Sequence, residues 1–428
     1  MTPQHHDPYA AFRIPAYRWY IIGWFLASVG TRIQSVAIGW EMYQRTGQPL
    51  SLGLVGLAQA LPTMLLALPA GYLADKFSRP RLVMISLTAM TVTSLGLGWL
   101  SFTNGATWWM YTLLLLDASA VMIGRPARVA LVPQLVPAAV FPNAVTWNTS
   151  LMQISGVLGP AVGGLIVAQY VPAAYVVTAL SSLLFIFMLA RLKFRVDGPR
   201  AGTATFQTLV AGVQFVFNAR ILLTMISLDL FAVLLGGAVY LLPIYAEDIL
   251  DVGAAGFGWL RAAPAVGAFV MAILMVYMPP MKRAGWSLLL NVAGFGVATI
   301  VFGVSQSFWL SFAMLFLTGA FDNVSMVVRQ TLQQLLTPDH MRGRVSAVTS
   351  VFVGASNELG GLESGLVAQW LGPVFSVVSG GIGTILVVMV TAWVSPELRR
   401  FGALHEAKPI EVPEEPAPTS PGRPAEAD

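Results

Sequence analysis

The sequence predicts an all-α membrane protein whose twelve transmembrane helices form two six-helix bundles. Hydrophobic residues make up 56% of the 428 residues and charged residues only 10%, whereas a soluble domain carries about 25% charged residues. Twelve apolar runs approach or exceed the length of about 20 residues that a membrane helix needs. The halves also match each other after a shift of 201 positions, which places Arg128 on Arg329, Gly159 on Gly360 and Gly164 on Gly365. Repeated halves in an apolar chain are typical of two-bundle transporters.

The apolar runs form two groups of six, separated by a polar stretch. The first six predicted spans are 18–42, 51–74, 82–102, 107–130, 143–168 and 172–192. The second six are 221–245, 254–278, 286–305, 308–332, 345–369 and 373–395. We therefore expect a tail at 1–17, a first bundle at 18–194, a linker at 195–219, a second bundle at 220–395 and a tail at 396–428.

The linker contains apolar residues at helical spacing, namely Phe206, Leu209, Val210, Val213 and Phe217. This stripe predicts an amphipathic helix in the membrane interface, most simply a connector without a regulatory role. The final residues are rich in Pro, Glu and Ala, which predicts a disordered tail.

The distribution of basic residues predicts the orientation in the membrane. One set of helix ends carries most of the arginines and lysines, whereas the other carries Arg45 beside Glu247, Asp248 and Asp251. Because cytoplasmic loops are enriched in Lys and Arg, we expect both termini in the cytoplasm and a multi-pass protein of the bacterial inner membrane.

The composition argues against several classes of function. There is no cysteine, and His5, His6, His340 and His405 all lie outside the apolar runs. We therefore expect no thiolate chemistry, metal site or cofactor. The basic residues form no continuous patch, so no nucleic-acid partner is expected. No phosphate-binding GxxxxGK[ST] loop of a primary pump occurs. A receptor or scaffold without transport activity is not excluded by these observations.

The loop after the second span, Gly71 to Arg81 (GYLADKFSRPR), resembles the loop signature of the major facilitator superfamily. It departs from that signature at Ser78 and Pro80. Further stretches, at 125–128 (RPAR), 229–231 (DLF) and 341–347 (MRGRVSA), resemble the drug:proton antiporter branch that contains the enterobactin exporter and macrolide efflux proteins. The resemblance covers about 18–395. It implies the major facilitator fold and export of small molecules in exchange for protons.

The resemblance also implies a gate at the cytoplasmic surface. In families with this loop, the acid contacts the start of span eleven and nearby basic residues in the outward-open state. The residues that match are Gly71, Asp75, Lys76, Arg79, Arg81, Arg128, Arg342 and Arg344. Part of this positive charge also follows from the positive-inside bias.

Span five contains a glycine motif with a central proline, Gly156, Gly159, Pro160, Gly163 and Gly164. It resembles the motif that marks antiporters in the superfamily. Glycines at this spacing clear one helix face so that a neighbouring helix approaches closely. Ordinary small-residue packing is the alternative explanation.

Ionisable residues inside the spans are candidates for function because they are costly in a membrane unless paired. The candidates for proton coupling are, in order, Asp322, Asp117 with Arg32, Glu358 and Asp229; Arg261 and Glu363 are also in spans. Asp322 has no basic residue within one helical turn, which suits a carrier that takes up and releases a proton. Arg32 lies roughly 21 Å from the cytoplasmic face and Asp117 about 15 Å from the other, so we expect these two to pair across the first bundle. A static ion pair is the alternative role.

We expect a monomer that works with a small-molecule substrate, protons and membrane lipid, and that is not an enzyme. Polar, aromatic and methionine side chains of the spans are candidates for the cavity wall, namely Gln34, Trp40, Gln59, Met64, Trp147, Gln153, Tyr240, Met326 and Gln330. The leading function is proton-coupled export of amphipathic or apolar molecules. The alternatives within the fold are a lysophospholipid flippase and a solute-uptake symporter.

Overall fold

The first bundle consists of six long helices in an up-and-down order. The computed structural model describes residues 7–192, 206–278 and 281–404, and these residues form helices joined by short turns, which confirms the all-α prediction. A short 3₁₀ helix, η1 (Ala11–Arg13), precedes the bundle. The six helices are α1 (Pro15–Thr46), α2 (Pro49–Lys76), α3 (Arg79–Phe102), α4 (Thr107–Leu135), α5 (Phe141–Gln169) and α6 (Val171–Ala190).

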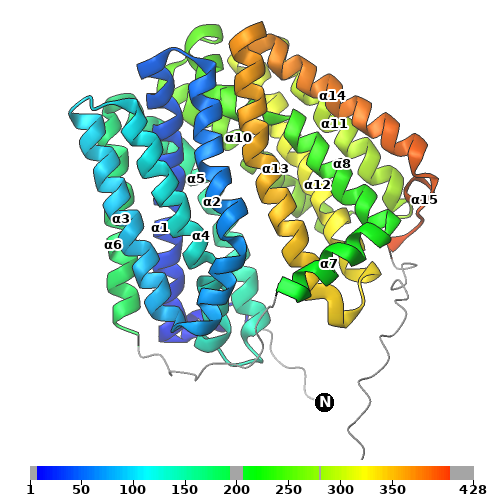
Figure 1. The fold of residues 1–428 in the computed structure, drawn as a ribbon, viewed down its shortest axis with the longest axis horizontal. Helices are drawn as coiled ribbons and strands as arrows, with labels where there is room; N and C mark the ends of the chain where they lie inside the picture. Colours follow the sequence, from blue (N-terminus) through cyan, green and yellow to red (C-terminus); the bar gives the residue numbers. More distant parts are fainter. Residues whose placement is uncertain (1–6, 193–205, 279–280, 405–428) are drawn as a thin grey trace, which may run out of the picture.

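The second bundle repeats this arrangement beside the first (Figure 1). Its first span starts as α8 (Arg220–Leu235) and is interrupted near its end. The other five spans are α10 (Gly253–Tyr277), α11 (Ala284–Val304), α12 (Phe308–Leu336), α13 (Arg342–Leu371) and α14 (Pro373–Val394). Ten helical segments in the described ranges are long and apolar enough to cross a membrane. The other two bundle helices, α4 and α13, have 29 and 30 residues but carry charges such as Asp117 and Glu358.

The seventh span is discontinuous, whereas the sequence predicted one continuous helix over 221–245. After α8, the chain continues as a 3₁₀ turn, η2 (Gly237–Leu241), a short α9 (Leu242–Ile244) and a π turn, η3 (Tyr245–Ile249). Consecutive glycines, Gly236 and Gly237, weaken the helix at the break. Gly237 also lies against the Gly360 carbonyl of α13, where no side chain fits. The break frees backbone carbonyls inside the bundle.

The helix α7 (Phe206–Asn218) covers the segment that carries the apolar stripe. It lies against α13 at the lower edge of the second bundle in Figure 1. Phe215 and Val216 are buried in the core of that bundle, whereas Phe217, assigned to the apolar stripe, is exposed. The apolar face of α7 is therefore at least partly used for packing on protein. The side chains of Phe206, Leu209 and Val210 lie outside the described residues.

The beginning of the predicted disordered tail is folded. A short helix, α15 (Pro396–Arg399), packs against the start of α11, with Leu398 fully buried. The backbone N–H of Ala284 donates to the Gly402 carbonyl at 2.9 Å. The buried Leu398 explains why this part of the tail is folded, and residues 405–428 lie outside the described residues.

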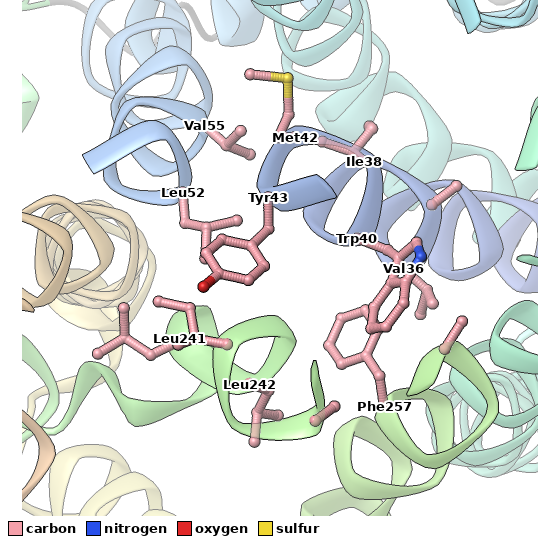
Figure 2. Packing of buried hydrophobic residues seen from close by; sticks show 14 of the residues in the cluster. Val36, Ile38, Trp40, Met42, Tyr43, Leu52, Val55, Leu241, Leu242 and Phe257 are labelled. Atoms are coloured by element: carbon pink, nitrogen blue, oxygen red, sulfur yellow. The ribbon is translucent and has the colours of Figure 1, made fainter. Parts of the chain in front are cut away.

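The two bundles are joined at the end opposite the start of α1 and the end of α14. We call this the far end, and the other end is the terminal end (Figure 1). A buried cluster at the far end contains residues from α1, α2, η2, α9 and α10 (Figure 2). Trp40 of the first bundle stacks on Phe257 of the second, with ring centroids 5.9 Å apart. Leu52 and Val55 of α2 belong to the same cluster as Leu241. This core seals the far end.

Two glycine crossings bring the bundle backbones together below this core. A methyl group on Gly164 of α5 would lie 2.6 Å from the Gly258 Cα of α10. A methyl group on Gly365 of α13 would lie 2.8 Å from the Gly53 Cα of α2. The internal match places Gly164 on Gly365, so the repeated glycine occupies equivalent crossings in the two halves.

The bundles diverge at the terminal end (Figure 1). A methyl group added to Gly71 at the end of α2, or to Gly343 at the start of α13, would meet no other part of the described chain within 4 Å. The same two helices touch at the far end through Gly53 and Gly365. The structure thus represents a state that is closed at the far end and open at the terminal end.

Candidate functional site

A cavity of about 450 Å³ lies inside the second bundle. Its wall comes from α8, η2, α10, α11, α12 and α13. Much of the wall is apolar and includes Met225, Phe295, Phe302, Leu315 and Met326. The polar part of the wall includes Asp229, Tyr240, Asn291, Asp322, Arg329, Gln330 and Asn357. Three of the predicted cavity residues, Tyr240, Met326 and Gln330, therefore line this cavity.

Two carboxylates of the cavity wall share one guanidinium. Arg329 of α12 forms an ion pair with Asp229 of α8, and its Nη2 lies 3.6 Å from Asp322 Oδ1. The Asp229 side chain is 8% exposed, whereas that of Asp322 is 52% exposed. Both carboxylates line the cavity, but Asp229 is the buried partner of the arginine and Asp322 is the exposed one.

Asp322 is therefore not the unpaired acid that the sequence predicted. Arg329 follows it by seven residues, which is two helical turns and places both side chains on the same face of α12. A search limited to one turn misses this partner. Two signals identify Arg329: its place inside a predicted span, and its match to Arg128 in the first half.

Asp117 and Arg32 do not pair, which corrects a second prediction. Asp117 is buried within the first bundle and accepts hydrogen bonds from Thr93 Oγ1 at 2.7 Å and Gln34 Nε2 at 3.3 Å. Ser94 Oγ donates to Gln34 Oε1 at 2.6 Å. Gln34 follows Arg32 by two residues on α1, so their side chains point to different helix faces. Asp117 belongs to a satisfied internal network.

A second polar cluster lies where the bundles meet. Tyr240 donates to Glu358 Oε2 at 2.5 Å. Arg261 of α10 donates to Ser35 Oγ of α1 at 3.1 Å and to the Val239 carbonyl at 3.2 Å. That carbonyl belongs to η2, the interrupted part of the seventh span. A small cavity of about 30 Å³ adjoins Ser35, Tyr240 and Arg261, and the predicted Gln59 lines it.

The glycine motif of α5 faces two neighbours rather than one. A methyl group on Gly159 would lie 2.3 Å from Arg32 Cβ, and one on Gly163 would lie 3.1 Å from the Ile33 Cα, both on α1. Gly164 crosses α10 of the other bundle, and Gly156 faces Ala265 there at 3.5 Å. Pro160 is buried between these crossings. The motif therefore joins α1, α5 and α10, and Arg32 lies beside this junction.

Several residues predicted for the cavity lie elsewhere because their side chains are used in packing. Gln34 is buried in the Asp117 network, and Trp40 is in the far-end core. Trp147 donates to the Pro8 carbonyl at 2.8 Å and stacks on Tyr9, so it anchors the N-terminal segment to α5. Met64 of α2 is exposed and Gln153 of α5 is half-buried, and neither lines the large cavity.

The residues of the predicted gate are separate in this state. Asp75 forms no ion pair within the described residues. Arg79 donates to the Ala130 carbonyl at 3.3 Å, and Lys76 lies over the Tyr72 ring at 5.5 Å. Across the opening, Arg342 pairs with Asp339 at 2.9 Å and Arg344 contacts Met341. Arg81 is exposed, and the backbone carbonyl of Arg128 accepts from Tyr20 at 3.0 Å.

Polar contacts close the far end. Tyr43 of α1 donates to Asp248, and Gln44 donates to Glu247 Oε1 at 2.9 Å. The Leu50 N–H donates to Gln369 Oε1 at 3.3 Å. Two of the three acids that the charge distribution assigned to this side, Glu247 and Asp248, thus serve as partners between the bundles.

Comparison with known proteins identifies relatives across nearly the whole chain. The family profile described as a transmembrane secretion effector matches residues 6–417. The enterobactin exporter EntS of Escherichia coli O1:K1 / APEC is 24% identical over 393 residues, which cover 90% of this chain and 93% of the exporter. The same protein of Shigella boydii serotype 18 matches equally.

Solved structures share the fold at low sequence identity. A POT family transporter in complex with 5-aminolevulinic acid superposes with a TM-score of 0.71 at 12% identity, over 89% of this chain and 96% of that one. A D-xylose-proton symporter superposes with a TM-score of 0.66 at 13% identity, over 91% and 98%. The two-bundle architecture of these transporters is therefore that of the chain.

Proposed function

The chain belongs to the transmembrane secretion effector family of the major facilitator superfamily, and we propose that it is a proton-coupled antiporter that exports amphipathic small molecules. As a member it is a multi-pass membrane transporter and not an enzyme. Its bacterial relatives support a place in the bacterial inner membrane. The excess of Arg and Lys at the terminal end supports a cytoplasmic location of that end. We infer that the protein works as a monomer.

The observation that carries this proposal is the cluster of Asp229, Arg329 and Asp322 in the cavity wall. A single arginine needs one carboxylate for charge balance in a medium of low dielectric. When Asp322 takes up a proton, Asp229 and Arg329 remain as a neutral pair. When Asp322 releases the proton, Arg329 is within reach of the new carboxylate. Asp322 can thus change its charge without leaving another buried charge unpaired.

The cavity fits an amphipathic substrate. Its volume of about 450 Å³ falls within the range of small-molecule sites. Methionine and phenylalanine side chains adapt to apolar bodies of different shape. A substrate inside the second bundle would lie beside Asp322, so that protonation of Asp322 and binding of the substrate would compete at the same part of the cavity. The family, together with the exporter among the relatives, favours movement out of the cell.

Alternating access follows from the two ends of the bundles. The far end is closed by an apolar core and two glycine crossings, and the terminal end is open. Rocking about the crossings would open the far end and bring α2 and α13 together at the terminal end. Asp75 would then approach the start of α13, where Arg342 and Arg344 lie.

We expect Asp75→Asn to slow turnover about tenfold or more without lowering the stability of the state described here. Asp75 has no ion-pair partner among the described residues of this state, so its charge contributes only when the terminal end closes. Transport rate and thermal unfolding of the purified protein measure the two effects. Asp339→Asn is the matched control, because Asp339 pairs locally with Arg342. An unchanged rate for Asp75→Asn would contradict the gate.

The proposed function is tested by flux into proteoliposomes with an acidic lumen. An antiporter uses the outward movement of protons to accumulate substrate inside, whereas a symporter would expel it. The panel consists of dyes that are not weak bases and of siderophores of the class that EntS exports by name. We expect accumulation that a protonophore abolishes. If the flux of every transported compound is the same with and without the pH gradient, proton coupling is refuted.

A further inference from the structure

We propose that Arg32 and Arg261 form an anion-binding site between the bundles, which takes the acidic group of an amphipathic substrate. Arg32 is on α1 of the first bundle and Arg261 on α10 of the second. The inference rests on the proposed function, because it names the chemical class of molecule that the transporter carries.

The position of Arg32 on α1 directs it toward the second bundle. Ser35 and Gly39 follow it by three and seven residues and so lie on the same helix face. Ser35 accepts a hydrogen bond from Arg261. The Cβ position of Gly39 is 3.6 Å from the Phe257 ring on α10. The face that carries Arg32 therefore looks into the space between the bundles and not into lipid.

The site has more positive than negative charge. Arg32 is exposed and has no carboxylate partner among the described residues. Arg261 is held by the Ser35 hydroxyl and the Val239 carbonyl, which carry no charge. Glu358, the acid of this polar cluster, accepts from Tyr240 and forms no ion pair with Arg32 or Arg261 among the described residues. Ser35, whose hydroxyl accepts from Arg261, is one helical turn from Arg32 on the same face of α1. An anion is the missing component.

The unpaired arginine has a consequence for the transport cycle. Water reaches Arg32 while the terminal end is open, but closure of that end removes the water. An arginine that is desolvated in a membrane without a partner is unfavourable. A bound anion would remove this obstacle, so that closure is favoured when the site is occupied.

The rest of the substrate would extend into the large cavity. Tyr240 lines both the small cavity beside Arg261 and the large cavity of the second bundle. An acidic group at the arginines would therefore place an attached apolar body beside Tyr240, toward Met326 and Phe295. The structure fits a molecule with an anionic group, such as a carboxylate, sulfonate or phenolate, on an apolar or aromatic body.

The first test compares two probes that differ in charge and hardly in shape. Dansylglycine is an anion, and dansylglycinamide is its neutral analogue. Fluorescence titration of the full chain in lipid nanodiscs measures binding of each. We expect the wild type to prefer the anion by about tenfold, as for a charge-assisted hydrogen bond. Arg32→Gln should remove the preference and Arg32→Lys should keep part of it.

The second test measures closure directly and needs no ligand. The chain has no cysteine, so Val145→Cys and Tyr277→Cys can carry two spin labels at exposed positions of α5 and α10 on the terminal end. Their distance distribution reports closure. Arg32→Gln should populate the short distance without ligand, because the unpaired arginine that closure would desolvate is then absent. Dansylglycine, and not the amide, should shorten the distance in the wild type.

Arg125→Gln is the matched control for both tests. It makes the same change of residue and charge at an exposed position of α4, whereas Arg32 is on α1. Equal behaviour of Arg32→Gln and Arg125→Gln in both tests would overturn the proposal, and so would a wild type that prefers the amide. If neither probe binds, the proposal is tested by the spin-label distances of the wild type, Arg32→Gln and Arg125→Gln without ligand. If the wild type prefers the anionic probe but shows no proton-driven flux, the proposed antiport is wrong and the anion site still stands.

Discussion

Asp322→Asn is expected to abolish proton-driven accumulation while leaving exchange of labelled for unlabelled substrate. An amide at this position cannot take up or release a proton. It also leaves Arg329 with its buried partner Asp229, so the variant imitates the protonated state without creating an unpaired charge. We expect accumulation in vesicles with an acidic lumen to fall at least about tenfold. Counterflow at equal pH should stay within about threefold of the wild type.

Asp117→Asn is the matched control for this prediction. Asp117 is also an acid inside a span, but Thr93 and Gln34 satisfy it within the first bundle. Asp117→Asn should lower the free energy of unfolding by about 1–3 kcal/mol, because an acceptor oxygen is replaced by an NH₂ donor that faces the donor of Gln34. The number of protons moved per substrate should not change. If Asp322→Asn accumulates substrate like the wild type, or if only Asp117→Asn loses coupling, Asp322 is not the carrier.

The sequence predicted the fold because hydropathy and charge act over whole helices. Twelve apolar runs and the repeated glycines are properties of long segments, and the all-α fold with two bundles agrees with them. The interrupted seventh span escaped prediction because its break depends on Gly237 meeting the backbone of α13. Such a contact between distant segments leaves no local signal.

For the candidate site, the sequence identified the charged residues but not their partners. Asp322, Asp229 and Glu358 could be recognised because a charge inside a span is conspicuous. Their partners could not, since pairing depends on which helix faces meet. Asp117 and Arg32 lie at similar depth, yet their side chains point to different neighbours. Arg329 was overlooked although it lies on the same helix face as Asp322, two turns away.

Gly164→Ala is expected to reduce transport at least about tenfold by weakening closure of the far end. The added methyl group would lie 2.6 Å from the Gly258 Cα and 2.8 Å from the Ala254 carbonyl oxygen. Both are backbone atoms, so α5 and α10 would have to separate. Overpacking of this kind costs roughly 1–3 kcal/mol. The 2.6 Å approach belongs to the state that is closed at the far end, so the cost falls on that state and shifts the population toward the state open at that end.

Gly156→Ala isolates the crossing from the rest of the glycine motif. It adds the same methyl group to the same helix, and that group would lie 3.5 Å from Ala265 Cβ, which is an ordinary contact. The transport rate of Gly156→Ala should stay near that of the wild type. Spin labels across the far end should report the short, closed distance for Gly156→Ala but not for Gly164→Ala. Gly365→Ala should behave like Gly164→Ala, because Gly365 makes the equivalent crossing with Gly53. If both crossing variants transport normally, the repeated glycines serve packing alone and the bundles rock about another contact.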